Sequence, residues 1–163
     1  MPTQVVTKVL RASTGALVKA GDTVGVWYQG TLVNGGQQFD ANYNFASISP
    51  VPGRELFAFG LGMGQVIKGW DQALVGRRLG EILDLEIPAE LAYGAQGAPP
   101  NIPANAPLRF KVELVGAMPS GSTQAVYPTL AEIGVDQSSL AKLSRIKPNL
   151  EAMRAGTGFN DVV

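Results

Sequence analysis

Side chains alternate in character along two segments of the chain, which is the pattern of β-strands with two distinct faces. In residues 23–32, one face carries Val24, Val26 and Tyr28, and the other carries Gly25, Trp27 and Gln29. In residues 108–115, an apolar face of Leu108, Phe110, Val112 and Leu114 alternates with Arg109, Lys111, Glu113 and Val115. The second segment therefore predicts a half-buried strand with one face in water.

Four further segments predict strands separated by turns. Residues 5–10 are rich in β-branched side chains, residues 56–59 form a short apolar run, and a proline ends a similar run over residues 82–87. The pair Asn34-Gly35 is a strong hairpin signal, because both residue types tolerate positive φ. Residues 37–40 are therefore expected to form the returning strand.

One segment has the spacing of a short helix. Within residues 65–75, one face carries Val66, Ile67, Trp70 and Leu74, and a glycine at position 76 is placed to end the helix. Residues 41–56 and 93–107 lack regular spacing and contain Gly, Pro and Asn, which predicts a bulged excursion and a loop. Many antiparallel strands with a single short central helix predict an α+β fold.

The composition changes after Met118, where residues 119–123 are typical of a linker. Beyond it, Asp136 is a candidate N-cap for one short helix, and Pro148 is placed to open a second. The sequence therefore predicts a domain over residues 1–118 and a linker with short C-terminal helices over residues 119–163. The role of this extension stays open between packing on its own domain, pairing with a second copy and docking a partner.

The charge balance limits the partners that are expected. The 163 residues include 13 Lys and Arg and 13 Asp and Glu, so the formal net charge is zero. Nucleic acids and anionic membranes attract basic faces, and neither is an expected partner. No apolar run approaches the ~20 residues that span a bilayer, and the first residues lack the basic and apolar regions of a signal peptide. The cellular compartment stays open.

Two residue types with versatile chemistry are missing from the sequence. Without Cys there is no disulfide, no thiolate nucleophile and no thiolate zinc site. Without His there is no Ser-His-Asp triad, and the commonest metal ligand is lost. Any catalysis must proceed without thiolate or imidazole, and neither a metal nor a cofactor is expected.

Aromatic side chains gather where the predicted strands meet loops. They are Tyr28, Phe39, Phe57, Phe59, Trp70, Tyr93 and Phe110. Core packing is the commoner role for such residues, and a concave pocket is the alternative. Because Phe57 and Phe59 alternate along a strand, at most one of them is expected to line a given cavity.

Four ordered segments resemble the signatures of the FKBP family of peptidyl-prolyl cis–trans isomerases. The first comprises residues 26–32 (VWYQGTL) and 36–40 (GQQFD), the second residues 65–71 (QVIKGWD), the third residues 87–94 (IPAELAYG) and the fourth residues 102–110 (IPANAPLRF). The resemblance covers residues 4–117. It keeps the four segments in order at compatible spacing.

This resemblance implies a twisted antiparallel sheet of five to six strands wrapped around one short helix, and a pocket for proline. Trp70 would form the floor, Phe39 and Phe110 the wall near the rotating bond, and Asp40 would lie beside the amide. The backbone N–H of Ile67 and the hydroxyl of Tyr93 would hold substrate carbonyls. The remaining implied pocket residues are Tyr28, Phe57, Val66 and Ile102.

The implied reaction suits a chain without His or Cys. An Xaa-Pro amide isomerises over tens to hundreds of seconds across a barrier of about 18–20 kcal/mol. The twisted transition state has lost resonance and is less charge-separated than the planar amide, so a dry aromatic pocket favours it. Proline-containing polypeptides are the expected substrates, and macrolides such as tacrolimus or rapamycin are the implied inhibitors.

Two features depart from the family's pattern. The stretch between residues 39 and 57 is longer than in compact members, and Arg54 is the nearest candidate for the Arg that often pairs with the pocket Asp. The loop after Tyr93 carries Ala98 and Asn101 where members tend to carry His and an apolar residue. These changes bear on macrolide affinity and on substrate preference.

Two other functions were weighed against the isomerase. Gly60, Gly62 and Gly64 lie between a strand and a helix, as in a dinucleotide-binding fingerprint, but the third Gly has the wrong offset. A tight turn from strand to helix is therefore favoured at these glycines. A non-catalytic FKBP-fold module that binds proline-containing peptides or proteins stays the alternative to the enzyme.

Overall fold

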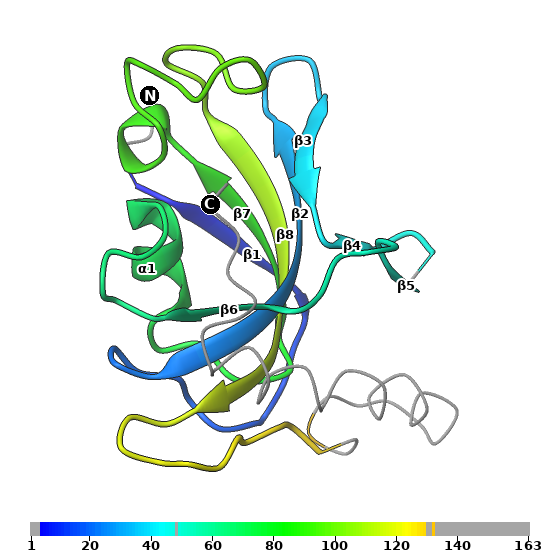
Figure 1. Cartoon of the computed structure of the whole chain (residues 1–163), viewed down its shortest axis with the longest axis vertical. Coiled ribbons are helices and arrows are strands. Elements are labelled where there is room, and N and C mark those ends of the chain that lie inside the picture. The colour runs from blue at the N-terminus through cyan, green and yellow to red at the C-terminus, as the bar shows by residue number, and fades with distance from the viewer. Residues whose placement is uncertain (1–3, 48, 130–131, 133–163) are drawn as a thin grey trace.

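The computed structural model describes residues 4–47, 49–129 and 132. Its main sheet has six strands, in the order β1-β7-β8-β2-β3, with β6 also paired to β2. The elements are β1 (Val6–Arg11), β2 (Thr23–Leu32), β3 (Gln38–Ala41), β4 (Tyr43–Asn44), β5 (Ser49–Pro50), β6 (Phe57–Gly60), α1 (Lys68–Leu74), β7 (Ile82–Ile87), η1 (Ala89–Leu91) and β8 (Leu108–Met118). The helix α1 lies against one face of the curved sheet (Figure 1). The predicted α+β fold is confirmed.

Strand β2 is the centre of the sheet. Along one edge it pairs with β8 over its whole length, from Thr23 opposite Met118 to Leu32 opposite Leu108. Its other edge is shared, because β6 pairs with residues 23–26 and β3 pairs with residues 29–31. Between these two partners, residues 27 and 28 have no strand opposite them on that edge. The polar part of the candidate site is built at this gap.

The core fills the space between the sheet and α1. Trp70 and Leu74 of the helix are fully buried against apolar side chains of the strands. The helix approaches β7 closely at Gly69, where a Cβ atom would stand 2.5 Å from Cγ2 of Ile87. A glycine is therefore required at this point to seat Trp70 at its observed depth.

The predicted strands are largely confirmed, and one prediction about exposure is wrong. Strands β2 and β7 have the expected bounds, whereas β8 runs on to Met118. The solvent-exposed face of β8 is limited to Arg109 and Lys111, because Glu113 is buried and paired with Arg11 at 3.0 Å. Val115 is buried as well. Burial raises the pKa of Glu113, and the charge of Arg11 opposes that rise.

The helix is shorter than the predicted range of residues 65–75. Gln65 accepts a hydrogen bond from the backbone N–H of Gly60 at 2.8 Å, so its side chain ties the preceding turn to β6. Ile67 is the N-cap residue and has an extended backbone with ψ of 149°. Val66 and Ile67 therefore lie ahead of the helix, although their spacing matches its apolar face.

The predicted excursion after β3 contains a small hairpin of β4 and β5, which projects from the sheet on the side away from α1 (Figure 1). Tyr43 stacks on Trp27 with ring centroids 5.1 Å apart, and Phe45 packs edge-on against Tyr43 at 4.9 Å. These contacts bury Trp27, so the second face of β2 is apolar at this point as well. The excursion is thereby fixed to the sheet by aromatic packing.

The chain returns to the domain after β8. Ala117 and Val126 exchange backbone hydrogen bonds of 2.9 and 2.6 Å, and the N–H of Thr14 donates to the carbonyl of Glu132 at 3.0 Å. The predicted C-terminal helices lie beyond Glu132, outside the described residues, so the division at residues 118 and 119 stays a prediction. No helix in the described ranges is long and apolar enough to cross a membrane.

Candidate active site

Trp70 lies at the centre of an aromatic cluster drawn from four elements. Its ring is fully buried on α1, and the rings of Tyr28, Phe57, Phe59 and Phe110 surround it at centroid distances of 5.5, 6.1, 5.6 and 5.1 Å. Three of these contacts are edge-to-face, the geometry that the quadrupoles of aromatic rings favour. The cluster thus fixes the rings around Trp70, the residue that the resemblance predicts as the pocket floor.

Phe57 and Phe59 lie on the same face of their strand, and the prediction that at most one of them lines a given cavity stays a prediction. Residues two apart on a strand point to the same face, so alternation does not divide this pair. The two rings stack at 5.4 Å, and both contact Trp70. Phe59 thus supports the floor, a role that its burial and its place in the strand pattern could have indicated.

A second pair of rings forms a wall beside the floor. Phe39 and Phe110 meet perpendicular to each other, with centroids 5.5 Å apart, and Phe39 is half-buried. Gly30 of β2 lies directly beneath them: a Cβ atom there would stand 2.7 Å from a ring atom of each. Gly30 was part of the first signature, but the sequence did not indicate that its lack of a side chain makes room for the wall.

A polar cluster stands at the edge of this wall. The hydroxyl of Tyr28 donates to Oδ2 of Asp40 at 2.5 Å, and Nη1 of Arg54 donates to Oδ1 of Asp40 at 3.2 Å. Nη2 of Arg54 also donates to the Tyr28 hydroxyl at 3.1 Å. Arg54, which the sequence offered only as the nearest candidate, is therefore the partner of Asp40, and one guanidinium bridges both side chains.

Two members of this cluster, Tyr28 and Arg54, have raised pKa values. Burial raises the pKa of Tyr28, and the hydrogen bond and negative charge of Asp40 raise it further. Burial acts to lower the pKa of Arg54, but Tyr28 and Asp40 oppose it and the net direction is upward. Tyr28 is thus a neutral donor and Arg54 a cation throughout the ordinary pH range.

Tyr93 and Ile102 are placed by the loop that follows η1. The backbone N–H of Ala98 donates to Ile102 at 2.9 Å, and the return bond is 3.0 Å. This closed turn buries Ile102, while Tyr93 packs partly buried against the same core. Burial and the charge of Asp40 raise the pKa of Tyr93 to about 12, so its hydroxyl lies within the field of that carboxylate.

Val66 and Ile67 complete the set from the segment just before α1. Each has 8% of its surface exposed, and both belong to the apolar cluster that contains Trp70. As the N-cap residue, Ile67 has a backbone N–H that lies outside the hydrogen-bond pattern of the helix. Nine of the ten predicted site residues thus belong to the hydrophobic core or pack against it, and Asp40 is bonded to Tyr28. Ring contacts and this bond directly connect six of the ten, which are Tyr28, Phe39, Asp40, Phe57, Trp70 and Phe110.

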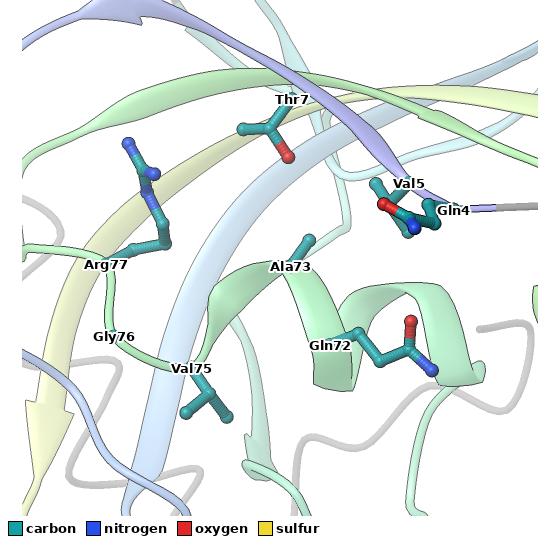
Figure 2. A pocket seen from close by; sticks show the side chains of 8 residues that line it. All are labelled: Gln4, Val5, Thr7, Gln72, Ala73, Val75, Gly76 and Arg77. Carbon is teal, nitrogen blue, oxygen red and sulfur yellow. The ribbon is translucent and has the colours of Figure 1, made fainter. Parts of the chain in front are cut away.

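One groove on the surface lies away from the predicted site residues. A groove of about 390 Å³ runs between the start of β1 and the end of α1, lined by residues such as Thr7, Gln72 and Arg77 (Figure 2). None of the ten predicted site residues lines it.

In the part of the chain that the structure describes, no three Asp or Glu side chains gather as metal ligands. The indole Nε1 of Trp70 is buried, and no hydrogen-bond acceptor lies within reach of it.

Comparison with known proteins shows which family the chain resembles. Residues 15–115 match the model of a family described as FKBP-type peptidyl-prolyl cis–trans isomerase. Peptidyl-prolyl cis-trans isomerase FPR2 of Saccharomyces cerevisiae is 48% identical over 101 residues, covering 61% of this chain and 69% of that protein. Peptidyl-prolyl cis-trans isomerase FKBP15-2 of Arabidopsis thaliana is 47% identical over 58% of this chain and 53% of its own length. Peptidyl-prolyl cis-trans isomerase FKBP2 of Mus musculus is 47% identical over 60% of this chain and 63% of its own length. The chain thus spans from about half to just over two thirds of these relatives.

Proposed function

This chain belongs to the family of FKBP-type peptidyl-prolyl cis–trans isomerases, and on that premise we propose that it accelerates Xaa-Pro rotation in the pocket floored by Trp70. The observation that carries the proposal is the juxtaposition of a dry aromatic floor with a single fixed carboxylate, Asp40. The floor accepts a pyrrolidine ring, and the carboxylate lies beside the wall where the amide would turn.

The chemistry requires no group that this chain lacks. Rotation breaks amide resonance without breaking a covalent bond, so the protein has only to favour the twisted amide over the planar one. Burial among aromatic rings disfavours the charge-separated planar form. The rings of Tyr28, Phe39, Trp70 and Phe110, together with the Asp40 carboxylate, are held in place by contacts with one another and can supply that environment without reorganising during the reaction.

We assign individual roles within the proposed site. Trp70 lies under the proline ring, and Phe39 and Phe110 form the wall at the rotating bond. The backbone N–H of Ile67 and the hydroxyl of Tyr93 hold substrate carbonyls. Asp40 acts on the twisted amide, and the surrounding surface comprises Tyr28, Phe57, Val66 and Ile102.

A protease-coupled assay on an Ala-Leu-Pro-Phe peptide tests this activity in the full chain. We expect a cis-to-trans rate that rises in proportion to protein concentration, because each pocket turns over independently. Calorimetric titration with a proline-containing peptide that the protease does not cut measures binding in parallel. Binding without acceleration would contradict the enzyme and support the non-catalytic module.

Macrolides are the second class of ligand that we propose for the same pocket. Tacrolimus and rapamycin each present a large apolar ring, which the half-exposed wall and buried floor can accommodate. The excursion of residues 41–56 and the turn at residues 98–102 shape the rim against which such a ring would rest. Competition between either macrolide and the peptide for binding would support the proposal; independent binding would contradict it.

For the C-terminal extension we propose association with a second copy or with a partner, and packing on its own domain is the alternative. The described part of the extension is anchored on the domain through Val126 and Glu132, so the segment to be tested begins after Glu132. Light scattering on the full chain and on a chain ending at residue 132 compares their masses. Equal monomeric masses would contradict self-association.

A further inference from the structure

The side chain of Asn42 occupies the gap on β2 between its two partner strands. It is fully buried, with 0% of its surface exposed. Its Oδ1 accepts the backbone N–H of Tyr28 at 2.7 Å, and its Nδ2 donates to the carbonyls of Val26 at 3.2 Å and Glu55 at 3.1 Å. One amide therefore satisfies backbone groups from two separate segments.

These bonds replace the missing strand. On the shared edge of β2, the pairing with β6 extends from Thr23 to Val26, and the pairing with β3 extends from Gln29 to Thr31. Buried backbone groups must be paired, and no strand reaches the stretch between Val26 and Gln29 on this edge. The Asn42 side chain takes the bonds of Val26 and Tyr28, and its own backbone N–H donates to the Tyr28 carbonyl at 3.1 Å.

The same residue holds the backbone on both sides of Arg54. On the following side, its side chain binds the carbonyl of Glu55. On the preceding side, its backbone carbonyl accepts the N–H of Val51 at 3.0 Å, and Val51 in turn accepts the N–H of Arg54 at 3.0 Å. Arg54 lies 14 residues from Asp40 along the chain, so this double connection is what returns it to the carboxylate.

We propose that Asn42 is a positioning residue for the isomerase reaction, acting through Arg54 to fix the Asp40 carboxylate beside the wall. This proposal rests on the proposed function. Asn42 sits on β2 at Tyr28, whose hydroxyl binds Asp40, and at the base of the segment that carries Arg54. The Asn42 side chain is therefore bonded to the backbone of one partner of the carboxylate, Tyr28, and to the backbone next to the other, Arg54. A shift of about 1 Å in such a group can cost up to ~100-fold in rate.

The test compares Asn42→Ala and Asn42→Ser with Asn44→Ala in the full chain. Asn44 offers a matched control, because it is an exposed amide two residues further on, whose side chain accepts the local N–H groups of Ala46 and Ser47. Asn42→Ser keeps a hydroxyl that can bind the Tyr28 N–H and creates a smaller defect than alanine. Each variant is assayed for kcat and KM with the proline tetrapeptide, after circular dichroism has established that it folds.

A double-mutant cycle with Arg54→Ala separates a positioning role from simple loosening of the fold. We expect Asn42→Ala to lower kcat by about tenfold, with KM within about twofold and Asn44→Ala unchanged. In the Arg54→Ala background, Asn42→Ala should lower kcat by less than about twofold, because the guanidinium through which Asn42 acts is absent.

Three results would overturn the proposal: an unchanged kcat in Asn42→Ala, an equal loss with and without Arg54, or failure of both Asn42 variants to fold. The last would assign Asn42 to the fold alone. An inactive wild-type chain would instead refute the proposed function, and the positioning role with it. An active wild type with active Asn42 variants would refute the positioning role alone.

Discussion

The floor and the rim of the candidate site are held by different forces. The floor rings of Tyr28, Phe57, Trp70 and Phe110 have at most 1% of their surface exposed and come from regular elements. The rim groups, such as Asp40 and Arg54, stand at the end of a short strand or in a loop and are fixed by hydrogen bonds. Burial is non-directional and tolerates small shifts, whereas hydrogen bonds fix position within a few tenths of an ångström. Changes in the floor should therefore alter stability and turnover together, and changes in the rim mainly turnover.

The largest effect is expected from Trp70→Ala. Removing a fully buried indole leaves a cavity among four rings, so the free energy of unfolding should fall by about 3–5 kcal/mol and proline binding should be lost. Urea unfolding followed by far-UV circular dichroism measures the change. Met63→Ala is the control, since that side chain is 62% exposed. A loss below about 1 kcal/mol for Trp70→Ala would contradict a floor held by burial.

Gly30→Ala tests the junction of floor and rim. The new methyl group would meet Phe39 and Phe110 at 2.7 Å, so both rings must move. We expect the free energy of unfolding to fall by about 1–3 kcal/mol, with a loss of kcat/KM from the displaced wall. Adding Phe39→Leu should recover part of the stability, because one of the two clashes is removed. Full stability and full activity in the single variant would show that the wall is not confined.

Arg54→Lys tests the rim by itself. Lys keeps the positive charge, but it cannot span Asp40 and Tyr28 as the guanidinium does. We expect kcat/KM to fall by about three- to tenfold, while the free energy of unfolding changes by less than about 1 kcal/mol, since the Arg54 side chain is partly exposed. Arg109→Lys, at an exposed ion pair on β8, should leave the peptide assay unchanged. If Arg54→Lys lowered the free energy of unfolding as much as Trp70→Ala, the floor and the rim would not be held by different forces.

The smallest effect is expected on stability at alkaline pH, where Tyr93 ionises. The pKa of Tyr93 is about 12 in the folded chain, above the ordinary value of 10.0. The unfolded chain therefore loses this proton first as pH rises, so the contribution of Tyr93 to stability is complete below pH 10 and declines between pH 10 and 12. By pH 11 the wild type should lose less than about 1 kcal/mol relative to Tyr93→Phe, since Tyr93 is partly exposed. Unfolding of both proteins at pH 8, 10 and 11 measures the difference, and a constant gap would argue that the hydroxyl titrates normally.

The burial of Trp70 could be predicted from the sequence, its role as pocket floor rests on the resemblance to the FKBP family and stays a prediction, and the details of the rim could not be predicted. Strand β2 has its expected bounds, and Trp70 falls on the apolar face of the helical segment, because burial leaves a periodic pattern in the residues. Periodicity misjudged Glu113, since a long-range partner, Arg11, allows that carboxylate to be buried. The helix start was misplaced for a similar reason, because the side chain of Gln65 binds Gly60 and holds the preceding turn.

The rim depends on contacts that span many residues. Arg54 could be named only as the nearest arginine, because its pairing with Asp40 requires the hairpin of β4 and β5 to fold back first. Asn42 left no signal at all, since an asparagine in an irregular segment is ordinarily a turn residue. Only the three-dimensional gap between β3 and β6 shows that its amide stands in for a strand.

The two tryptophans of the chain report on different parts of the molecule. Trp70 forms the floor, while Trp27 stacks on Tyr43 on the opposite face of β2. A Trp27→Phe variant would therefore leave a single indole, seated in the pocket and lacking a hydrogen-bond acceptor on Nε1. If the proposed site holds, the fluorescence of that indole would report the binding of a proline-containing peptide without an attached dye.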